Sequence, residues 1–248
     1  MEKFCDILCR HAGIKPSSTV LVVTIKALKL HGGAPDNKLS VEDLESLKKG
    51  LPNMERHLQN IRNFGLPVVV AINRFPSDTE AEIEVIKKKC EELNVPVALS
   101  EVVAKGGKGG IELATKVLES LKKKADFKYL YDLNDPIKVK IMKLARNYGA
   151  GDVVFTKEAE ADIQQMEKLG LANIPINMAK TPNSVTDDPK VVGAPTGFKI
   201  TVTNVRSFTG AGWLVAYCGS IMTMPALPSQ PAAEKMDIDE NGKIMGLF

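Results

Sequence analysis

Apolar and polar residues follow one another along this chain in blocks typical of strands and helices. Residues 19–25 (TVLVVTI) and 67–72 (PVVVAI) are continuous apolar runs rich in β-branched side chains, and residues 96–99 (PVAL) form a shorter run. Runs of this kind predict strands that are buried on both faces. We therefore expect an α/β fold in which a parallel sheet carries helices on both faces.

The segments between these runs have helical periodicity. Ser77-Asp-Thr-Glu80 fits a capping box at a helix start. The apolar positions that follow share one helical face: Ile83, Ile86, Cys90 and Leu93. The Lys87-Lys-Lys89 run lies mainly off this face among glutamates, so we interpret it as a solvated surface rather than a binding patch. A further helix is predicted after Gly110, with its apolar stripe formed by Ile111, Ala114, Leu118 and Leu121.

The second half keeps the alternation in a weaker form. We expect a helix over 137–148 closed by Gly149, a strand over 152–156, a helix that stops at Gly170 and a half-exposed strand over 198–203. Gly and Pro become frequent from Asn173 onward. The chain is therefore predicted to have a parallel α/β region at 1–124 that carries the site. A smaller and more irregular α/β region is expected at 125–248.

Composition narrows the classes of protein that the chain can represent. The 33 Lys and Arg residues nearly balance the 30 Asp and Glu residues, which argues against a nucleic-acid binder. Four cysteines in 248 residues and a start without a signal-peptide core suit the cytoplasm. The longest uncharged stretch, 207–233, is interrupted by Gly and Pro, so no membrane partner is expected.

The glycine-rich segment Lys105-Gly-Gly-Lys-Gly-Gly110 follows a predicted strand and precedes a helix, where backbone N–H groups can hold an anion. It does not match a Walker A loop, because Gly109 follows Lys108 where Ser or Thr is needed, nor does it match the dinucleotide pattern. A tight turn is the favoured interpretation, with an anion site as the alternative.

Other chemistry-bearing residues give weaker signals. Cys5, Cys9 and His11 offer three ligands at a spacing that no standard zinc module uses, so no metal site is expected. No catalytic residue is assigned either, since the histidines lack an evident nucleophile or acid partner. Trp213 and Tyr217 are interpreted as core residues.

Phe75 stands apart because it follows the strand predicted at 67–72 and precedes Pro76 and the predicted capping box. The carboxyl ends of parallel strands are where open α/β sheets usually bind ligands. An aromatic ring there can stack on a flat ligand or can close the top of the core, and the residues alone leave both interpretations open.

These segments resemble formate–tetrahydrofolate ligase (10-formyltetrahydrofolate synthetase) over nearly the whole chain. The matching residues, in order, are Lys3-Phe-Cys-Asp-Ile7, Ala27-Leu-Lys-Leu-His-Gly-Gly33, Val69-Val-Ala-Ile-Asn73, Asp78-Thr-Glu-Ala-Glu82, Ala104-Lys-Gly-Gly-Lys-Gly-Gly110, Asn177-Met-Ala-Lys-Thr181, Gly193-Ala-Pro195, Gly210-Ala-Gly212, Ile221-Met-Thr-Met-Pro225 and Gly246-Leu-Phe248.

The resemblance implies an ATP-dependent C–N ligase of one-carbon metabolism. In such enzymes ATP and formate give formyl phosphate, and the N10 amine of tetrahydrofolate then attacks the formyl carbon and expels phosphate. The folate-binding residues that it implies are Phe75, Pro76, Leu99, Val103, Lys105 and Lys108. Phe75 would stack on the pterin, Lys105 and Lys108 would meet the carboxylates of the glutamate tail, and Val103 stands where the family has a second stacking aromatic, a Trp.

Family members are roughly twice as long and carry their phosphate-binding loop in the half that has no counterpart here. We therefore expect the C-terminal part of a split ligase, inactive alone, with a second polypeptide that binds ATP and magnesium. The resemblance also suggests a monovalent cation and a homo-oligomer. The alternatives are a non-catalytic folate-binding or assembly protein, which Val103 favours slightly, and a truncated product that folds without activity.

Overall fold

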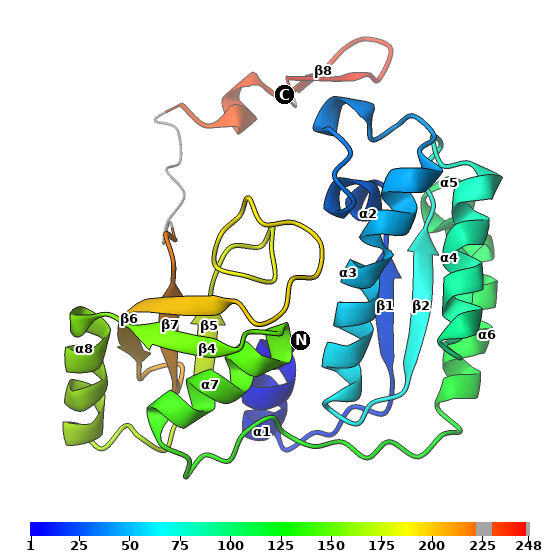
Figure 1. Cartoon of the computed structure of the whole chain (residues 1–248). Helices are drawn as coiled ribbons and strands as arrows, with labels where there is room; N and C mark the ends of the chain where they lie inside the picture. The colour runs from blue at the N-terminus through cyan, green and yellow to red at the C-terminus, as the bar shows by residue number, and fades with distance from the viewer. Residues whose placement is uncertain (222–229, 247–248) are drawn as a thin grey trace.

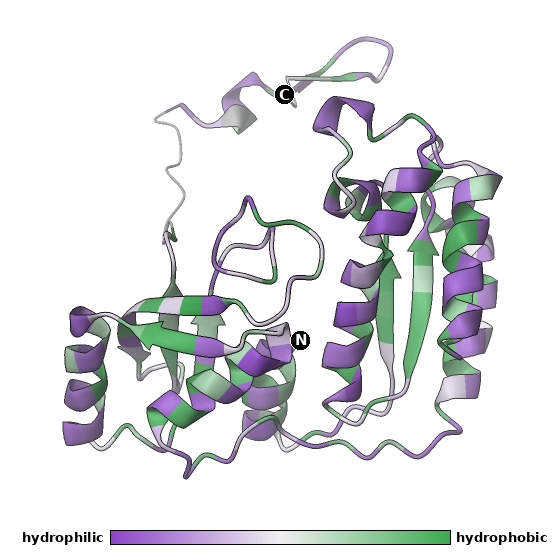
Figure 2. Ribbon diagram, viewed as in Figure 1, coloured by the Kyte–Doolittle hydropathy of each residue, from purple (hydrophilic) through white to green (hydrophobic). Residues whose placement is uncertain are grey.

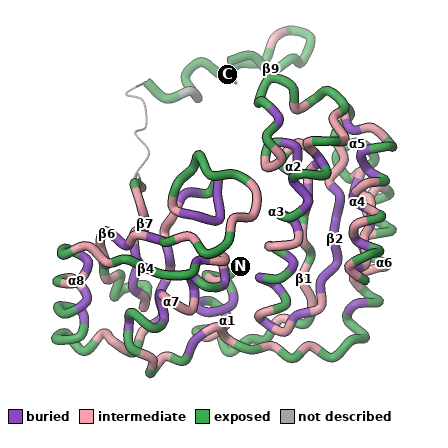
Figure 3. Tube along the Cα trace, in the orientation of Figure 1, coloured by how far each residue is buried: buried purple, intermediate pink, exposed green. Residues whose placement is uncertain are grey.

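The computed structural model describes residues 1–221 and 230–246, and its first half is built on a three-stranded parallel sheet of order β1-β2-β3. The strands are β1 (Thr19–Val23), β2 (Val68–Asn73) and β3 (Val97–Ser100). The helices α2 (Ile25–His31), α3 (Leu44–Arg62), α4 (Glu80–Glu92), α5 (Val102–Lys105) and α6 (Ile111–Ser120) surround them (Figure 1). Both α3 and α6 pack on β2, which is buried along most of its length (Figure 3). The predicted α/β class is confirmed.

The strand predicted at 19–25 is shorter and more exposed than its composition indicates. It ends at Val23, because Thr24 caps α2 by accepting a hydrogen bond from the Ala27 N–H. Val20 and Val22 are exposed, so the expectation of burial on both faces is wrong here. The reason is position: β1 lies at the sheet edge, and α6 packs over β2 and β3 instead.

The capping box lies two residues beyond the predicted one. Thr79 caps α4 by accepting from the N–H of Glu82, and the Glu82 carboxylate accepts from the N–H of Thr79. Ser77 lies instead in the turn before the helix. The prediction of a capping box at Ser77–Glu80 is therefore wrong by two residues. The predicted apolar face of the helix that follows is confirmed, since Ile83, Ile86 and Cys90 are buried.

Helix α6 faces the sheet with a side different from the one predicted. Ile111 and Leu118 are more than 60% exposed, and Leu121 is exposed as well. Ser120 is buried, and its hydroxyl hydrogen-bonds to that of Ser18 just before β1. The helix is amphipathic as expected, but its apolar stripe points away from the first core, and the prediction of a buried stripe is wrong.

The second half contains a four-stranded mixed sheet of order β4-β6-β7-β5. β6 and β7 are antiparallel, whereas the outer pairs β4–β6 and β5–β7 are parallel. Its elements are α7 (Ile137–Tyr148), β4 (Asp152–Phe155), α8 (Lys157–Lys168), β5 (Ile176–Ala179), β6 (Lys199–Phe208) and β7 (Trp213–Cys218). Gly149 closes α7 in the left-handed conformation, as predicted. β5 and β7 were not predicted, while the half-exposed strand at 198–203 corresponds to the start of the longer β6.

The start of the chain joins the two halves. The helical turn η1 (Lys3–Leu8) and α1 (Cys9–Ala12) lie beside β5 of the second sheet (Figure 1). The Asp6 carboxylate accepts from the Leu130 N–H at 3.0 Å, and Arg10 donates to the Tyr131 carbonyl. Cys5 packs into the first core. The division at residue 124 stays a prediction.

Short elements complete the described chain. They are η2 (Asp36–Lys38), η3 (Gly106–Gly110), η4 (Ala232–Lys235), β8 (Asp237–Ile238) and β9 (Ile244–Met245). Apolar residues are concentrated on the strands in both halves (Figure 2). Within 1–221 and 230–246, no helix combines the length and apolar character needed to cross a bilayer. Three of the sequence features fall partly outside the described residues. They are the motifs Ile221–Pro225 and Gly246–Phe248 and the uncharged stretch 207–233.

Candidate functional site at the carboxyl ends of β2 and β3

A cavity of about 310 Å³ lies where β2 and β3 end. Asn73 and Ser100 are register partners at these ends, and the Arg74 N–H donates to the Ser100 carbonyl at 3.1 Å. The two chain segments therefore leave the sheet side by side. The lining residues come from these segments: Asn73, Arg74, Phe75, Pro76, Glu101, Val103 and Ala104.

A tight turn holds Phe75 at the cavity. Its N–H donates to the Asp78 carboxylate at 2.8 Å, and the Asp78 N–H donates back to the Phe75 carbonyl at 3.0 Å. Burial raises the pKa of the Asp78 carboxyl. The Lys26 ammonium lies 5.1 Å from the centre of the Phe75 ring but does not line the cavity. One ring face thus carries a cation, and the cavity offers the remaining surface to a flat ligand.

Two charged side chains stand among the apolar lining. A guanidinium nitrogen of Arg74 lies 3.3 Å from Glu101 Oε1, and another lies 2.7 Å from the Glu80 carboxylate. Lys105 Nζ lies 2.5 Å from Glu101 Oε2. The Lys105 hydrogen bond and the nearby cations lower the pKa of Glu101. The cavity therefore contains a carboxylate that is ionised at neutral pH.

The structure brings only part of the predicted site together. Phe75, Pro76 and Val103 line the cavity, with Val103 at its rim, since 89% of that residue is exposed. Leu99 instead packs against the first core. Lys105 and Lys108 are exposed and do not line the cavity. The Lys105 ammonium nevertheless donates a hydrogen bond to Glu101, which does line it.

Sequence reasoning missed Asn73, Arg74, Glu101 and Ala104. The signal that identified Phe75, a position shortly after the end of a strand, applies equally to Glu101, which follows β3. Extending that rule to every strand of the predicted parallel sheet would have found the carboxylate.

The glycine-rich segment forms a tight turn that packs on Glu101. The Glu101 N–H donates to the Gly109 carbonyl at 3.0 Å, while the N–H groups of Ala104 and Lys105 donate to the Glu101 carbonyl. A Cβ on Gly109 would lie 2.4 Å from that carbonyl oxygen, so only glycine fits at this close approach. The loop therefore sets the backbone position of Glu101.

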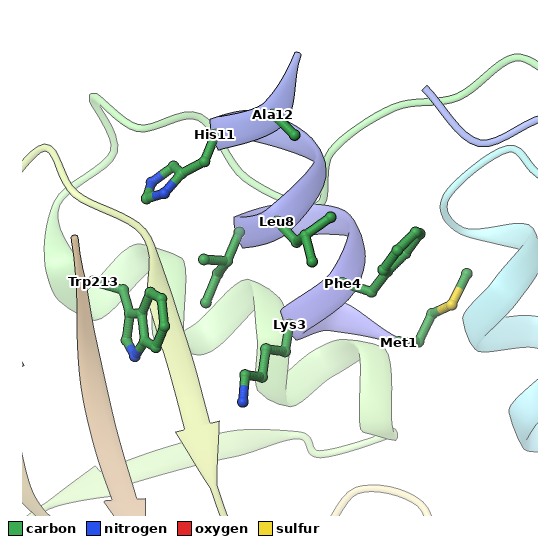
Figure 4. A pocket seen from close by; sticks show the side chains of 8 residues that line it. Met1, Lys3, Phe4, Leu8, His11, Ala12 and Trp213 are labelled. Carbon is green, nitrogen blue, oxygen red and sulfur yellow. The ribbon is translucent and has the colours of Figure 1, made fainter. Parts of the chain in front are cut away.

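A larger cavity of about 690 Å³ lies between the start of the chain and β7 (Figure 4). Phe4, Leu8 and Trp213 are part of its largely apolar lining, and Lys3 Nζ lies 6.0 Å from the Trp213 ring centre. Trp213 is half-buried at this surface rather than enclosed in the core. Among the described residues, those that line this cavity include no carboxylate that could accept from a ligand's N–H groups.

The other candidate residues, the cysteines and His31, take part in packing. Cys5 and Cys9 are buried free thiols, and burial raises the pKa of both. Among the described residues, no three His, Cys, Asp or Glu side chains are arranged to hold a metal ion. His31 Nδ1 accepts from the Gly193 N–H at 3.1 Å, which is a packing role.

The fold is that of an α/β protein with a cavity at the carboxyl edge of a parallel sheet. A sequence model of the family "Formate--tetrahydrofolate ligase" matches residues 1–248. The chain therefore belongs to the formate–tetrahydrofolate ligase family. This membership connects it with ligase chemistry, formate, tetrahydrofolate and one-carbon metabolism.

Proposed function

We propose that this chain supplies the folate-binding wall of a formate–tetrahydrofolate ligase. The observation that carries the proposal is the cavity at the ends of β2 and β3, which Phe75 and Pro76 line together with Glu101. A pterin is a planar heterocycle with polar edges. Its face suits an aromatic ring, and its edges suit a few well-placed polar groups.

The proposed reaction joins formate to N10 of tetrahydrofolate. Formate first attacks the γ-phosphorus of ATP, which gives formyl phosphate and ADP. The N10 amine then attacks the formyl carbon, and phosphate leaves with the electrons of the C–O bond. This chain would contribute chiefly position: holding the pterin fixes the amine relative to the formyl donor, and such orientation lowers the barrier substantially.

We infer that ATP with magnesium binds to a second polypeptide. The 248 residues contain neither a Walker A loop nor a dinucleotide loop, and the glycine-rich segment here positions Glu101. In this proposal the chain is inactive alone. A reducing cytoplasmic setting agrees with its four free cysteines. Self-association and a monovalent cation remain predictions from the resemblance.

The test begins with a calorimetric titration of the purified chain with tetrahydrofolate under anaerobic conditions. We expect saturable binding that Phe75→Ala weakens by about tenfold, because stacking and burial are both lost. Phe208→Ala is the matched control, since Phe208 is an exposed phenylalanine of β6 in the other half. Absence of folate binding by the native chain would overturn the proposal.

The second step adds a polypeptide that carries the P-loop half of the family. We expect formate-dependent formation of 10-formyltetrahydrofolate and ADP in the mixture, but not with either chain alone. Val103 favours one other candidate, a folate-binding protein without catalysis, because an aliphatic rim residue cannot stack. Folate binding without turnover in the mixture would support that candidate.

A further inference from the structure

Within the part of the chain that the structure describes, Glu101 is the one carboxylate that lines the proposed folate cavity. Its side chain is 20% exposed, and its two oxygens have different partners. Oε1 faces the Arg74 guanidinium at 3.3 Å, whereas Oε2 faces the Lys105 ammonium at 2.5 Å. The carboxylate is thus held in place while it remains accessible to a ligand.

The backbone of Glu101 is held from both sides. Its N–H donates to Gly109, and its carbonyl accepts from Ala104 and Lys105. Because Gly109 approaches that carbonyl closely, the loop cannot shift toward Glu101 without a clash. An acceptor fixed in this way before ligand binding loses little conformational entropy when a ligand binds.

The two cations differ in how easily a ligand could replace them. Lys105 is 58% exposed, and an ion pair with so exposed a partner contributes little to stability. Arg74 lines the cavity and is also anchored by Glu80 at 2.7 Å. A ligand can therefore displace Lys105 from Oε2 while Arg74 continues to compensate the charge of Glu101.

A pterin presents two N–H donors on one edge, its 2-amino group and N3–H. These donors lie in the ring plane at a spacing that matches the two oxygens of a carboxylate. A ring that packs against Phe75 would bring one of its edges toward the polar side of the cavity. In a largely apolar pocket, a few polar groups fix the orientation of the ligand.

We propose that Glu101 is a specificity-determining residue that accepts hydrogen bonds from the 2-amino and N3–H donors of the pterin. This inference rests on the proposed function, because it assumes that the cavity binds folate. It assigns to Glu101 the choice between a 2-aminopterin and rings that lack this donor pair. Phe75 supplies affinity for any flat ring, and Glu101 supplies orientation.

The experiment compares two ligands on the full chain by calorimetry: tetrahydrofolate and its analogue with a 2-methyl group in place of the 2-amino group. The native chain should bind tetrahydrofolate about 10- to 100-fold more tightly, the range expected for a hydrogen bond to a charged acceptor. In Glu101→Gln the ratio should fall to about threefold or less, because the amide loses the charge and one acceptor.

Glu80→Gln is the matched control, since it removes the other carboxylate partner of Arg74 without changing a cavity-lining residue. It should keep the native ratio. If Glu101→Gln does not fold, as judged by circular dichroism, Glu101→Asp replaces it; this variant retracts the carboxylate by one methylene and should also reduce the ratio.

The outcomes separate the two proposals. A native chain that binds neither ligand overturns the proposed function. A native chain that binds tetrahydrofolate but keeps its preference in the Glu101 variants overturns only the role of Glu101. A native chain that binds both ligands equally well has the same consequence.

Discussion

The Lys29 ammonium lies 2.8 Å from Oε1 of Glu82, and both side chains are at most 1% exposed. Lys29 also donates to the Val41 carbonyl, and Glu82 accepts from the N–H groups of Asp43 and Thr79. The pair therefore connects α2 with the starts of α3 and α4. Burial works to raise the pKa of Glu82, but Lys29 and the two N–H donors outweigh it, so the pKa lies below its usual value.

Breaking this pair should strongly destabilise the protein. Glu82→Gln leaves the Lys29 ammonium buried without a counter-charge, and the free energy of unfolding should fall by about 3–5 kcal/mol. Urea denaturation followed by circular dichroism measures the change. Glu45→Gln breaks the exposed pair with Lys49 and should lower the free energy of unfolding far less, because solvent screens this pair. Equal losses in the two variants would contradict the structural role of the buried pair.

Gly109 should resist even a single added methyl group. A Cβ there meets the Glu101 carbonyl at 2.4 Å, so Gly109→Ala has to displace the loop, at a cost of about 1–3 kcal/mol in the free energy of unfolding. Folate affinity should fall with it. Gly107→Ala is the control in the same loop, because its Cβ meets nothing within 4 Å. A Gly109→Ala protein with native stability and native folate affinity would refute the positioning role of the loop.

An aromatic residue at the rim of the cavity should strengthen folate binding. Val103→Trp adds a ring face where the native side chain is 89% exposed, and stacking worth about 0.5–1.5 kcal/mol predicts a threefold to tenfold gain in affinity. Calorimetry measures it. Val154→Trp places the same residue on exposed β4 and should leave the affinity unchanged. An unchanged or weaker affinity for Val103→Trp would show that the ring does not reach this rim.

The lysines of the glycine-rich segment should distinguish folates by the length of their glutamate tail. Lys105→Ala and Lys108→Ala should each weaken binding of polyglutamylated tetrahydrofolate severalfold at low salt, with a smaller effect on the monoglutamate. Lys88→Ala removes an exposed lysine of α4 and should change neither affinity. Equal affinities of native and variant proteins across a salt series would exclude a role in binding the tail.

Asp6 should make stability depend on pH. Burial raises the pKa of its carboxyl from 3.8 to about 7, despite the Leu130 N–H and Arg10 that favour its charged form. The folded state thus binds a proton that the unfolded chain releases. This contribution is full below pH 3.8 and is lost as the pH rises through about 7. Relative to Asp6→Asn, native stability should decline over this range and then level off. Denaturation of both proteins at each pH measures the difference, and parallel pH curves would contradict the assignment.

Much of the first half could be predicted from local pattern. The run at 67–72 is apolar enough to identify β2, and a position shortly after its end selected Phe75 as the residue at the sheet edge. The same reasoning did not reach Glu101, whose importance depends on β3 lying next to β2 and on the loop that folds back onto it. A side chain from a neighbouring segment enters a site only when the strands pair.

The sequence by itself determined the α/β class, the buried central strand β2 and, through its motifs, the family. Tertiary structure decided that β1 is a half-exposed edge strand, that α6 turns Ile111 and Leu118 to solvent and that Glu82 rather than Glu80 completes the capping box. The physical reason is that periodicity shows which residues share a face. Which face is buried, and which carboxylate has a buried partner, depends on elements distant in the chain that must pack against it.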